Sequence, residues 1–114
     1  MANRHRGEVS ALLNGERYEL CLTLGALAEL EEHLGVRDLV QLAARFELGH
    51  VSARDLIAII ACGLRGAGHD FTHDDVGRMK VQGGLEGYAK IAGDLFAATF
   101  GGDDQIGESQ QNPT

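Results

Sequence analysis

The middle of the chain runs Ser52-Ala53-Arg54-Asp55-Leu56-Ile57-Ala58-Ile59-Ile60-Ala61-Cys62. Ser52 and Asp55 have the spacing of a capping box, in which a hydroxyl and a carboxylate satisfy free N–H groups at a helix start. The residues that follow are apolar on nearly every side, which is typical of a helix with neighbours all around it. The sequence therefore predicts a central helix over about residues 53–65, against which the other elements pack.

A β-hairpin is predicted upstream, over about residues 7–22. Asn14-Gly15 suits a type I′ turn, because that turn needs a positive φ at both central residues. A two-residue loop pairs Leu13 with Glu16, and this register fixes which side chains share a face. The apolar face then holds Val9, Ala11, Leu13, Tyr18, Leu20 and Leu22. An isolated hairpin is only marginally stable in water, so we expect this face to cover helices.

Further helices are predicted over about residues 24–34, 38–47, 73–80 and 85–100, from the spacing of apolar residues and from end signals. Thr23 is expected to cap the first of them, and Thr72 with Asp75 repeats the capping box. We interpret the glycines of the stretch 63–68 as C-cap and turn residues. The expected fold class is α+β, mostly α: an N-terminal β-hairpin packed on a bundle of four to five short helices.

The domain organisation follows from a change of composition after Phe100. Residues 101–114 contain Gly, Asp, Gln, Ser and Asn with no Lys or Arg, and are predicted to form a disordered acidic tail. Residues 1–100 are then a single domain. The 114 residues carry 10 Lys and Arg against 17 Asp and Glu, which gives a net charge of −7. Phosphate backbones and anionic membranes repel such a chain, so we expect neither nucleic acid nor a membrane as partner.

The basic N-terminus lacks a following apolar segment, so no secretory signal is predicted and a cytoplasmic location is expected. Two cysteines, Cys21 and Cys62, are too few for a disulfide framework. Neither has the base and the electropositive setting of a catalytic thiol in the sequence around it. We expect both to be small residues of the core or its margin.

The densest polar cluster is His69-Asp70-Phe71-Thr72-His73-Asp74-Asp75. Its candidate metal ligands are His69, His73 and Asp74, and a metal-dependent enzyme using this cluster is a remote alternative. The competing interpretation is structural, because Thr72 and Asp75 are already needed as a helix cap and acidic residues favour a helix start. No Gly-x-Ser-x-Gly or His-Glu-x-x-His motif occurs. We therefore expect no enzyme activity, no cofactor and no resident metal.

What remains is a protein that binds other proteins. Leu12 lies on the otherwise polar face of the predicted hairpin, and Glu29 and Glu32 lie off the apolar stripe of the first helix. Together with Arg17 these residues are the candidate partner contacts, although a singly exposed leucine is also normal for a protein surface.

Three segments resemble the small tail proteins of gene transfer agents, which are similar to phage tail assembly chaperones. They are Met1 to Val9, the stretch Leu22-Thr23-Leu24-Gly25-Ala26-Leu27-Ala28-Glu29-Leu30-Glu31, and Cys62-Gly63-Leu64-Arg65-Gly66-Ala67-Gly68. The resemblance implies a gene lying between those of the tail tube and the tape-measure protein of a phage-like particle. No segment carries a catalytic motif, so the resemblance supplies no active-site residues.

The resemblance implies two roles. An assembly chaperone would bind the tape-measure protein, or the tail tube protein, during tail assembly, and a short hairpin among helices favours this role. The alternative is a structural tail tube component, which would remain in the particle. The oligomeric state is not set by the sequence, because free hairpin edges permit a dimer without requiring one.

Overall fold

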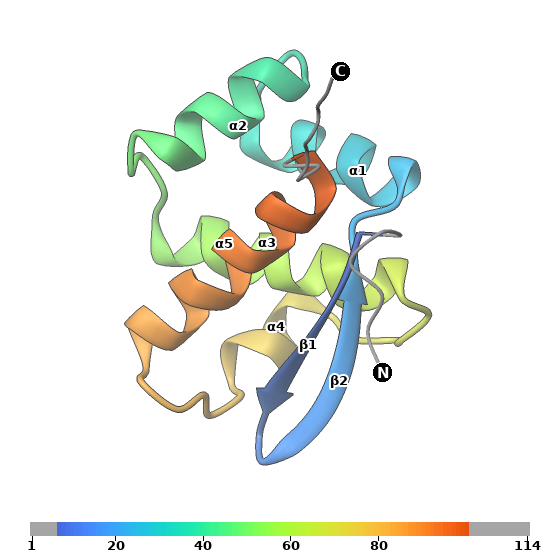
Figure 1. Cartoon of the computed structure of the whole chain (residues 1–114), viewed down its shortest axis with the longest axis vertical. Coiled ribbons are helices and arrows are strands. Elements are labelled where there is room, and N and C mark those ends of the chain that lie inside the picture. The colour runs from blue at the N-terminus through green and yellow to red at the C-terminus, as the bar shows by residue number, and fades with distance from the viewer. Residues whose placement is uncertain (1–6, 101–114) are drawn as a thin grey trace, which may run out of the picture.

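The computed structural model of the chain describes residues 7–100. It contains an antiparallel hairpin and five helices (Figure 1). The elements are β1 (Glu8–Leu13), β2 (Glu16–Cys21), α1 (Leu24–Leu34), α2 (Leu39–Glu47), α3 (Ala53–Gly66), α4 (His73–Gly77) and α5 (Leu85–Phe100). The predicted class, a hairpin packed on short helices, is confirmed, whereas the predicted acidic tail over 101–114 lies outside the described residues.

Helix α3 is the centre of the fold. α1, α4, α5 and β2 all pack against it, and every residue from Ala58 to Leu64 is buried. The capping box is present as predicted: Ser52 Oγ accepts the Asp55 N–H at 3.1 Å, and Asp55 Oδ2 accepts the Ser52 N–H at 3.0 Å. A helix that is apolar on all sides lies in the interior because only there can each side be covered.

The hairpin has the predicted register, with Leu13 opposite Glu16 and Val9 opposite Leu20. Asn14 adopts a φ of 57° at the turn, the left-handed conformation that this turn type requires. Asn14 also forms two hydrogen bonds that join the tip of the hairpin to Lys80, which is distant in the sequence. The Asn14 N–H donates to the Lys80 carbonyl oxygen at 2.9 Å, and the Lys80 N–H donates to Asn14 Oδ1 at 3.1 Å.

Helix α4 is shorter than predicted. It ends at Gly77, three residues before the predicted end at Lys80. The Tyr88 hydroxyl lies beside this end, with its oxygen 2.9 Å from the Val76 carbonyl oxygen and 2.8 Å from that of Met79. Its single proton is donated to one of these two carbonyl groups at a time, which gives the end of α4 a donor from α5.

The interpretation of the glycine-rich stretch is wrong for Gly63 and Gly66. Both lie inside α3, where they allow close packing. A Cβ atom on Gly66 would lie 1.9 Å from the Cys21 carbonyl oxygen, and one on Gly63 would lie 2.9 Å from Leu95 Cδ1. Only Gly68, with a φ of 98°, has the conformation of a turn glycine.

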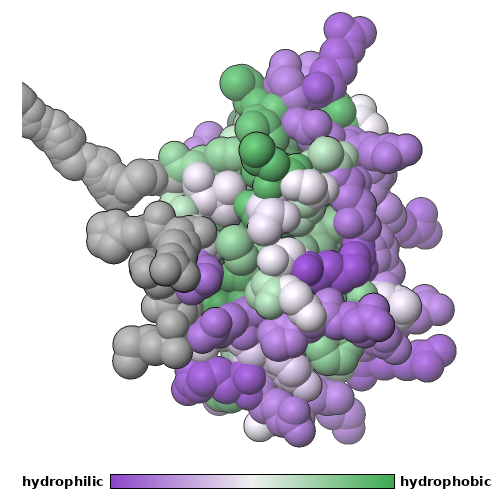
Figure 2. Space-filling model, turned by 90° about the vertical axis from the view of Figure 1, so that its right-hand side faces the viewer, coloured by the Kyte–Doolittle hydropathy of each residue, from purple (hydrophilic) through white to green (hydrophobic). Residues whose placement is uncertain are grey.

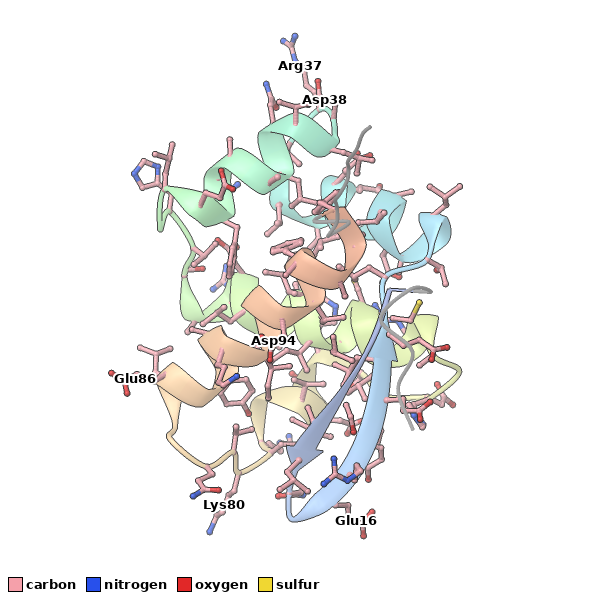
Figure 3. All side chains as sticks on the ribbon, in the orientation of Figure 1. Glu16, Arg37, Asp38, Lys80, Glu86 and Asp94 are labelled. Carbon is pink, nitrogen blue, oxygen red and sulfur yellow. The ribbon has the colours of Figure 1, made fainter. Side chains whose placement is uncertain are left out.

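Side chains of α2 and α5 complete the core. Phe46 of α2 meets Phe96 of α5 edge to face, with ring centroids 4.7 Å apart. Charged side chains lie at the periphery: Figure 3 shows Glu16 and Lys80 at one end of the molecule and Arg37 and Asp38 at the other. No helix within residues 7–100 is both long enough and apolar enough to cross a membrane.

Candidate functional site

A polar network lies where α1, α3 and α4 meet, and Arg65 of α3 is its centre. The Nη2 atom of Arg65 forms an ion pair with Glu29 of α1 and lies 3.8 Å from Cys62 Sγ. Its Nη1 atom donates to the Phe71 carbonyl oxygen at 2.9 Å. One guanidinium therefore joins α1, α3 and the segment that leads into α4.

Two histidines, His33 and His73, border this network next to α4. The rings of His33 and His73 meet edge to face with centroids 4.8 Å apart. Burial lowers the pKa of His73 below its ordinary value, and the positive charges of His33 and Arg65 lower it further. The surroundings of His73 thus disfavour its charged form, although the Glu29 and Asp74 carboxylates act in the opposite direction.

Cys62 lies at the bottom of the network and is fully buried. Burial raises the pKa of the Cys62 thiol to about 11, and the nearby Glu29 carboxylate adds to the shift. A nucleophilic cysteine needs the opposite shift, because the thiolate is the reactive form. The chemistry of Cys62 is therefore that of a small core residue.

Glu29, Cys62 and His73 also offer metal-ligand atoms that lie within 4.8 Å of one another. A carboxylate, a thiolate and an imidazole form a donor set that zinc accepts. The guanidinium of Arg65 is, however, already the cation beside both Glu29 and Cys62. The network reaches from the buried Cys62 to the exposed Glu29 carboxylate and is held by Arg65.

The candidate metal ligands predicted from the sequence, His69, His73 and Asp74, have different surroundings in the structure. His73 points into the network, whereas His69 packs on Tyr18, with ring centroids 5.3 Å apart. Asp74 lines a surface hollow beside His73. Sequence reasoning missed the neighbours of His73, because Glu29 and Cys62 belong to other helices and no local spacing links them.

The candidate partner contacts fall on two elements. Leu12 and Arg17 are directly opposite each other on the outer face of the hairpin, where Leu12 is 50% exposed. Arg17 donates to Ser10 Oγ at 3.0 Å on the same face. Glu29 and Glu32 lie on α1, and Glu29 is held by Arg65. The four candidates therefore lie on two elements, the hairpin and α1.

Exposed apolar side chains occur elsewhere on the molecule. Figure 2 looks onto the side where β2 leads into α1, and apolar atoms reach the surface in the upper half of this face. Leu24, the first residue of α1, is 80% exposed, and Val40 of α2 is 78% exposed. Large exposed apolar side chains of this kind suit contacts with other proteins.

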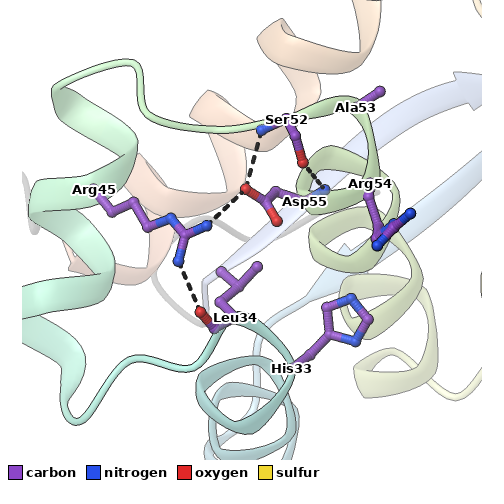
Figure 4. A pocket seen from close by; sticks show the side chains of 7 residues that line it. All are labelled: His33, Leu34, Arg45, Ser52, Ala53, Arg54 and Asp55. Atoms are coloured by element: carbon purple, nitrogen blue, oxygen red, sulfur yellow. Dashed lines mark hydrogen bonds and ion pairs between the residues drawn. The ribbon is translucent and has the colours of Figure 1, made fainter.

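A second polar contact fixes the start of α3 (Figure 4). Arg45 of α2 donates from Nη2 to Asp55 Oδ2 at 3.2 Å and from Nη1 to the Leu34 carbonyl oxygen at 2.7 Å. This guanidinium therefore joins α2 to the end of α1 and the start of α3. Arg54 and His33 lie side by side in the same view, and no hydrogen bond joins them to each other.

The comparisons with known proteins give one match. The model of a family described as phage tail tube protein, GTA-gp10, matches residues 6–102. Searches of the curated proteins and of the solved structures gave no match. The matched range covers both strands and all five helices described above. The chain therefore belongs to the phage tail tube protein family GTA-gp10 and is a tail protein of the phage or gene-transfer-agent type.

Proposed function

We propose that this chain is a structural, non-enzymatic component of the tail tube of a phage-like particle. The observation that carries the proposal is the extent of the family match, which spans residues 6–102 and so includes every described element. The proposed partners are other tail proteins, including further copies of the chain, and the proposed place of assembly is the cytoplasm of the producing cell.

The chemistry of the described polar groups supports a role in binding rather than in catalysis. The Cys62 thiol has a raised pKa, and Glu29 is neutralised by Arg65. Both groups are used inside the fold, where they hold helices together. Exposed apolar residues on α1 and α2 supply surface for contacts with other proteins.

The second candidate function is that of an assembly chaperone, which would bind tape-measure or tail tube protein and then leave. The size of the sheet favours it, because each strand has only six residues and the sheet over residues 7–100 has two strands. A subunit that builds rings by extending a sheet needs longer strands and more of them.

Quantitative mass spectrometry of purified particles, compared with the lysate of the producing cells, separates the two functions. Many copies per particle are expected for a tail tube component. Absence from finished particles, together with tailless heads after deletion of the gene, would contradict the tube proposal and establish the chaperone. The matched control is the tape-measure protein, which must be found in the same particles.

A further inference from the structure

A basic hollow of about 550 Å³ lies between the end of α1, the first turns of α3, and α4. Its charged or titratable lining consists of His33, Arg54, His73 and Arg78, with Asp74 as the carboxylate. The charged side chains of this lining are Arg54, Arg78 and Asp74, so the hollow has two guanidiniums and one carboxylate on a chain whose net charge is −7. Such a site attracts anionic groups.

The two arginines of the hollow have unused hydrogen-bonding capacity. Arg17, Arg45 and Arg65 each donate a side-chain hydrogen bond within the fold. The guanidiniums of Arg54 and Arg78, like that of Arg37, make no hydrogen bond or ion pair with any residue in the range 7–100, although the charge of Arg78 acts on the nearby Asp75 carboxylate. A guanidinium presents a planar set of donors that fits a carboxylate, so two unpaired guanidiniums in one hollow suit a ligand with more than one carboxylate.

The chain itself contains a segment with the complementary charge. Residues 101–114 include Asp103, Asp104 and Glu108 and contain no Lys or Arg. We propose that the basic hollow binds the acidic segment 101–114 of a second copy of the chain, with Arg54 and Arg78 facing Asp103 and Asp104.

The position of the hollow on α3 argues for a second copy rather than the same molecule. Arg54 and Gly63 are nine residues apart in α3, which is roughly two and a half turns and places them on opposite sides of the helix. Gly63 faces Leu95 of α5, so the C-terminal part of α5 around Leu95 lies on the side of α3 away from the hollow.

The acidic pair Asp103 and Asp104 can extend only a short distance from the end of α5. Asp103 and Asp104 follow the last residue of α5 by three and four positions, which is roughly 10–14 Å of extended chain. A single helix with its side chains is about 10–12 Å across, and α3 lies between the C-terminal part of α5 and the hollow. The acidic pair therefore fits the hollow of a neighbouring molecule better than its own.

A contact between a segment of one copy and a hollow of the next is heterologous, so it repeats from copy to copy into a ring or a filament. The inference goes beyond the proposed tail function. It concerns self-association of the purified chain, so it is tested without particles and fails or succeeds independently of that function.

The test is sedimentation velocity of the full chain at low and high salt, followed by charge reversal. Self-association that weakens with salt is expected for the natural sequence. The double variants Arg54→Glu with Arg78→Glu, and Asp103→Lys with Asp104→Lys, are each expected to weaken association ~tenfold or more. An equimolar mixture of the two is expected to associate again, because the reversed hollow then meets the reversed segment.

The matched control for the arginine variant is Lys80→Glu with Lys90→Glu, which lowers the net charge by the same amount at exposed lysines outside the hollow and should leave association unchanged. Circular dichroism checks that each variant is folded. A chain that stays monomeric at low salt overturns the proposal, as does a segment that binds its own molecule. A mixture that fails to associate while both variants are folded overturns it as well.

Discussion

The two sides of α3 differ in how they are packed. On the side of Gly63 and Gly66 the backbone of α3 approaches β2 and α5 so closely that a methyl group has no room. On the side of Arg54 and Arg65 long charged side chains fill the space towards α1 and α4. The difference shows that close backbone packing holds one side of α3, while polar contacts of Arg65 hold the other side and leave the guanidinium of Arg54 at the surface hollow.

The largest expected effect is on the close-packed side. Gly66→Ala places a Cβ atom 1.9 Å from the Cys21 carbonyl oxygen, and backbone cannot move away as a flexible side chain can. We expect a loss of about 3 kcal/mol in the free energy of unfolding, measured by urea denaturation. A variant as stable as the natural chain would contradict the close approach of α3 and β2.

The matched control is Gly25→Ala in α1. The nearest atom to its Cβ is Thr23 Oγ1 at 3.9 Å, so the methyl group is accommodated. Alanine also lowers the conformational entropy of the unfolded chain relative to glycine, and we expect a gain of about 0.5 kcal/mol. The same substitution thus has opposite signs at the two positions.

The next prediction concerns the start of α3, where the buried Asp55 carboxylate accepts hydrogen bonds. Asp55→Ala removes the acceptor of both the Ser52 N–H and the Arg45 guanidinium. Asp55 is buried and both donors lose their acceptor at once, so we expect a loss of about 2 kcal/mol in unfolding free energy. Asp75→Ala, in the exposed capping box of α4, is the comparison and should have a smaller effect.

Much of the fold could be predicted from the local sequence, because turns and helix caps are determined by residues that lie within a few positions of one another. Asn14-Gly15 fixed the register of the hairpin, and Ser52 with Asp55 fixed the start of the central helix. Gly66 was assigned to a turn because the sequence around it does not reveal that Cys21 lies against it. Close approach is a property of the tertiary structure.

The candidate site was less predictable for the same reason. His73 was grouped with His69 because they are near in sequence, but its neighbours are His33, Glu29 and Cys62 from two other helices. The sequence also predicts too late an end for α4, because it does not reveal that the Tyr88 hydroxyl of α5 lies at the Val76 and Met79 carbonyl oxygens. Only the relative positions of the helices could have shown these contacts.

A smaller effect is expected at the tip of the hairpin. Asn14→Ala removes the acceptor of the Lys80 N–H and places alanine at a φ of 57°. We expect a loss of about 1–2 kcal/mol in unfolding free energy. Asn14→Gly keeps the backbone conformation and loses only the side-chain acceptor, so it should be less harmful, and equal losses would exclude the backbone contribution.

The smallest effect is a pH dependence on the charged side of α3. Burial, and then the charges of His33 and Arg65, hold the pKa of His73 below its ordinary value of 6.5. The folded protein therefore binds this proton less readily than the unfolded chain does. Its contribution to stability is present above pH 6.5 and is lost as the pH falls through the lowered pKa.

His73→Gln should therefore reduce the loss of unfolding free energy between pH 7.5 and pH 5.5, as measured by urea denaturation at several pH values. His50→Gln is the control, because His50 is exposed and makes no ring contact among residues 7–100. Equal pH slopes for the natural chain and His73→Gln would show that the charged side of α3 accepts a further proton at no cost. In that case the positive charges around His73 would be well solvated, and the distinction between the two sides of α3 would rest on packing alone.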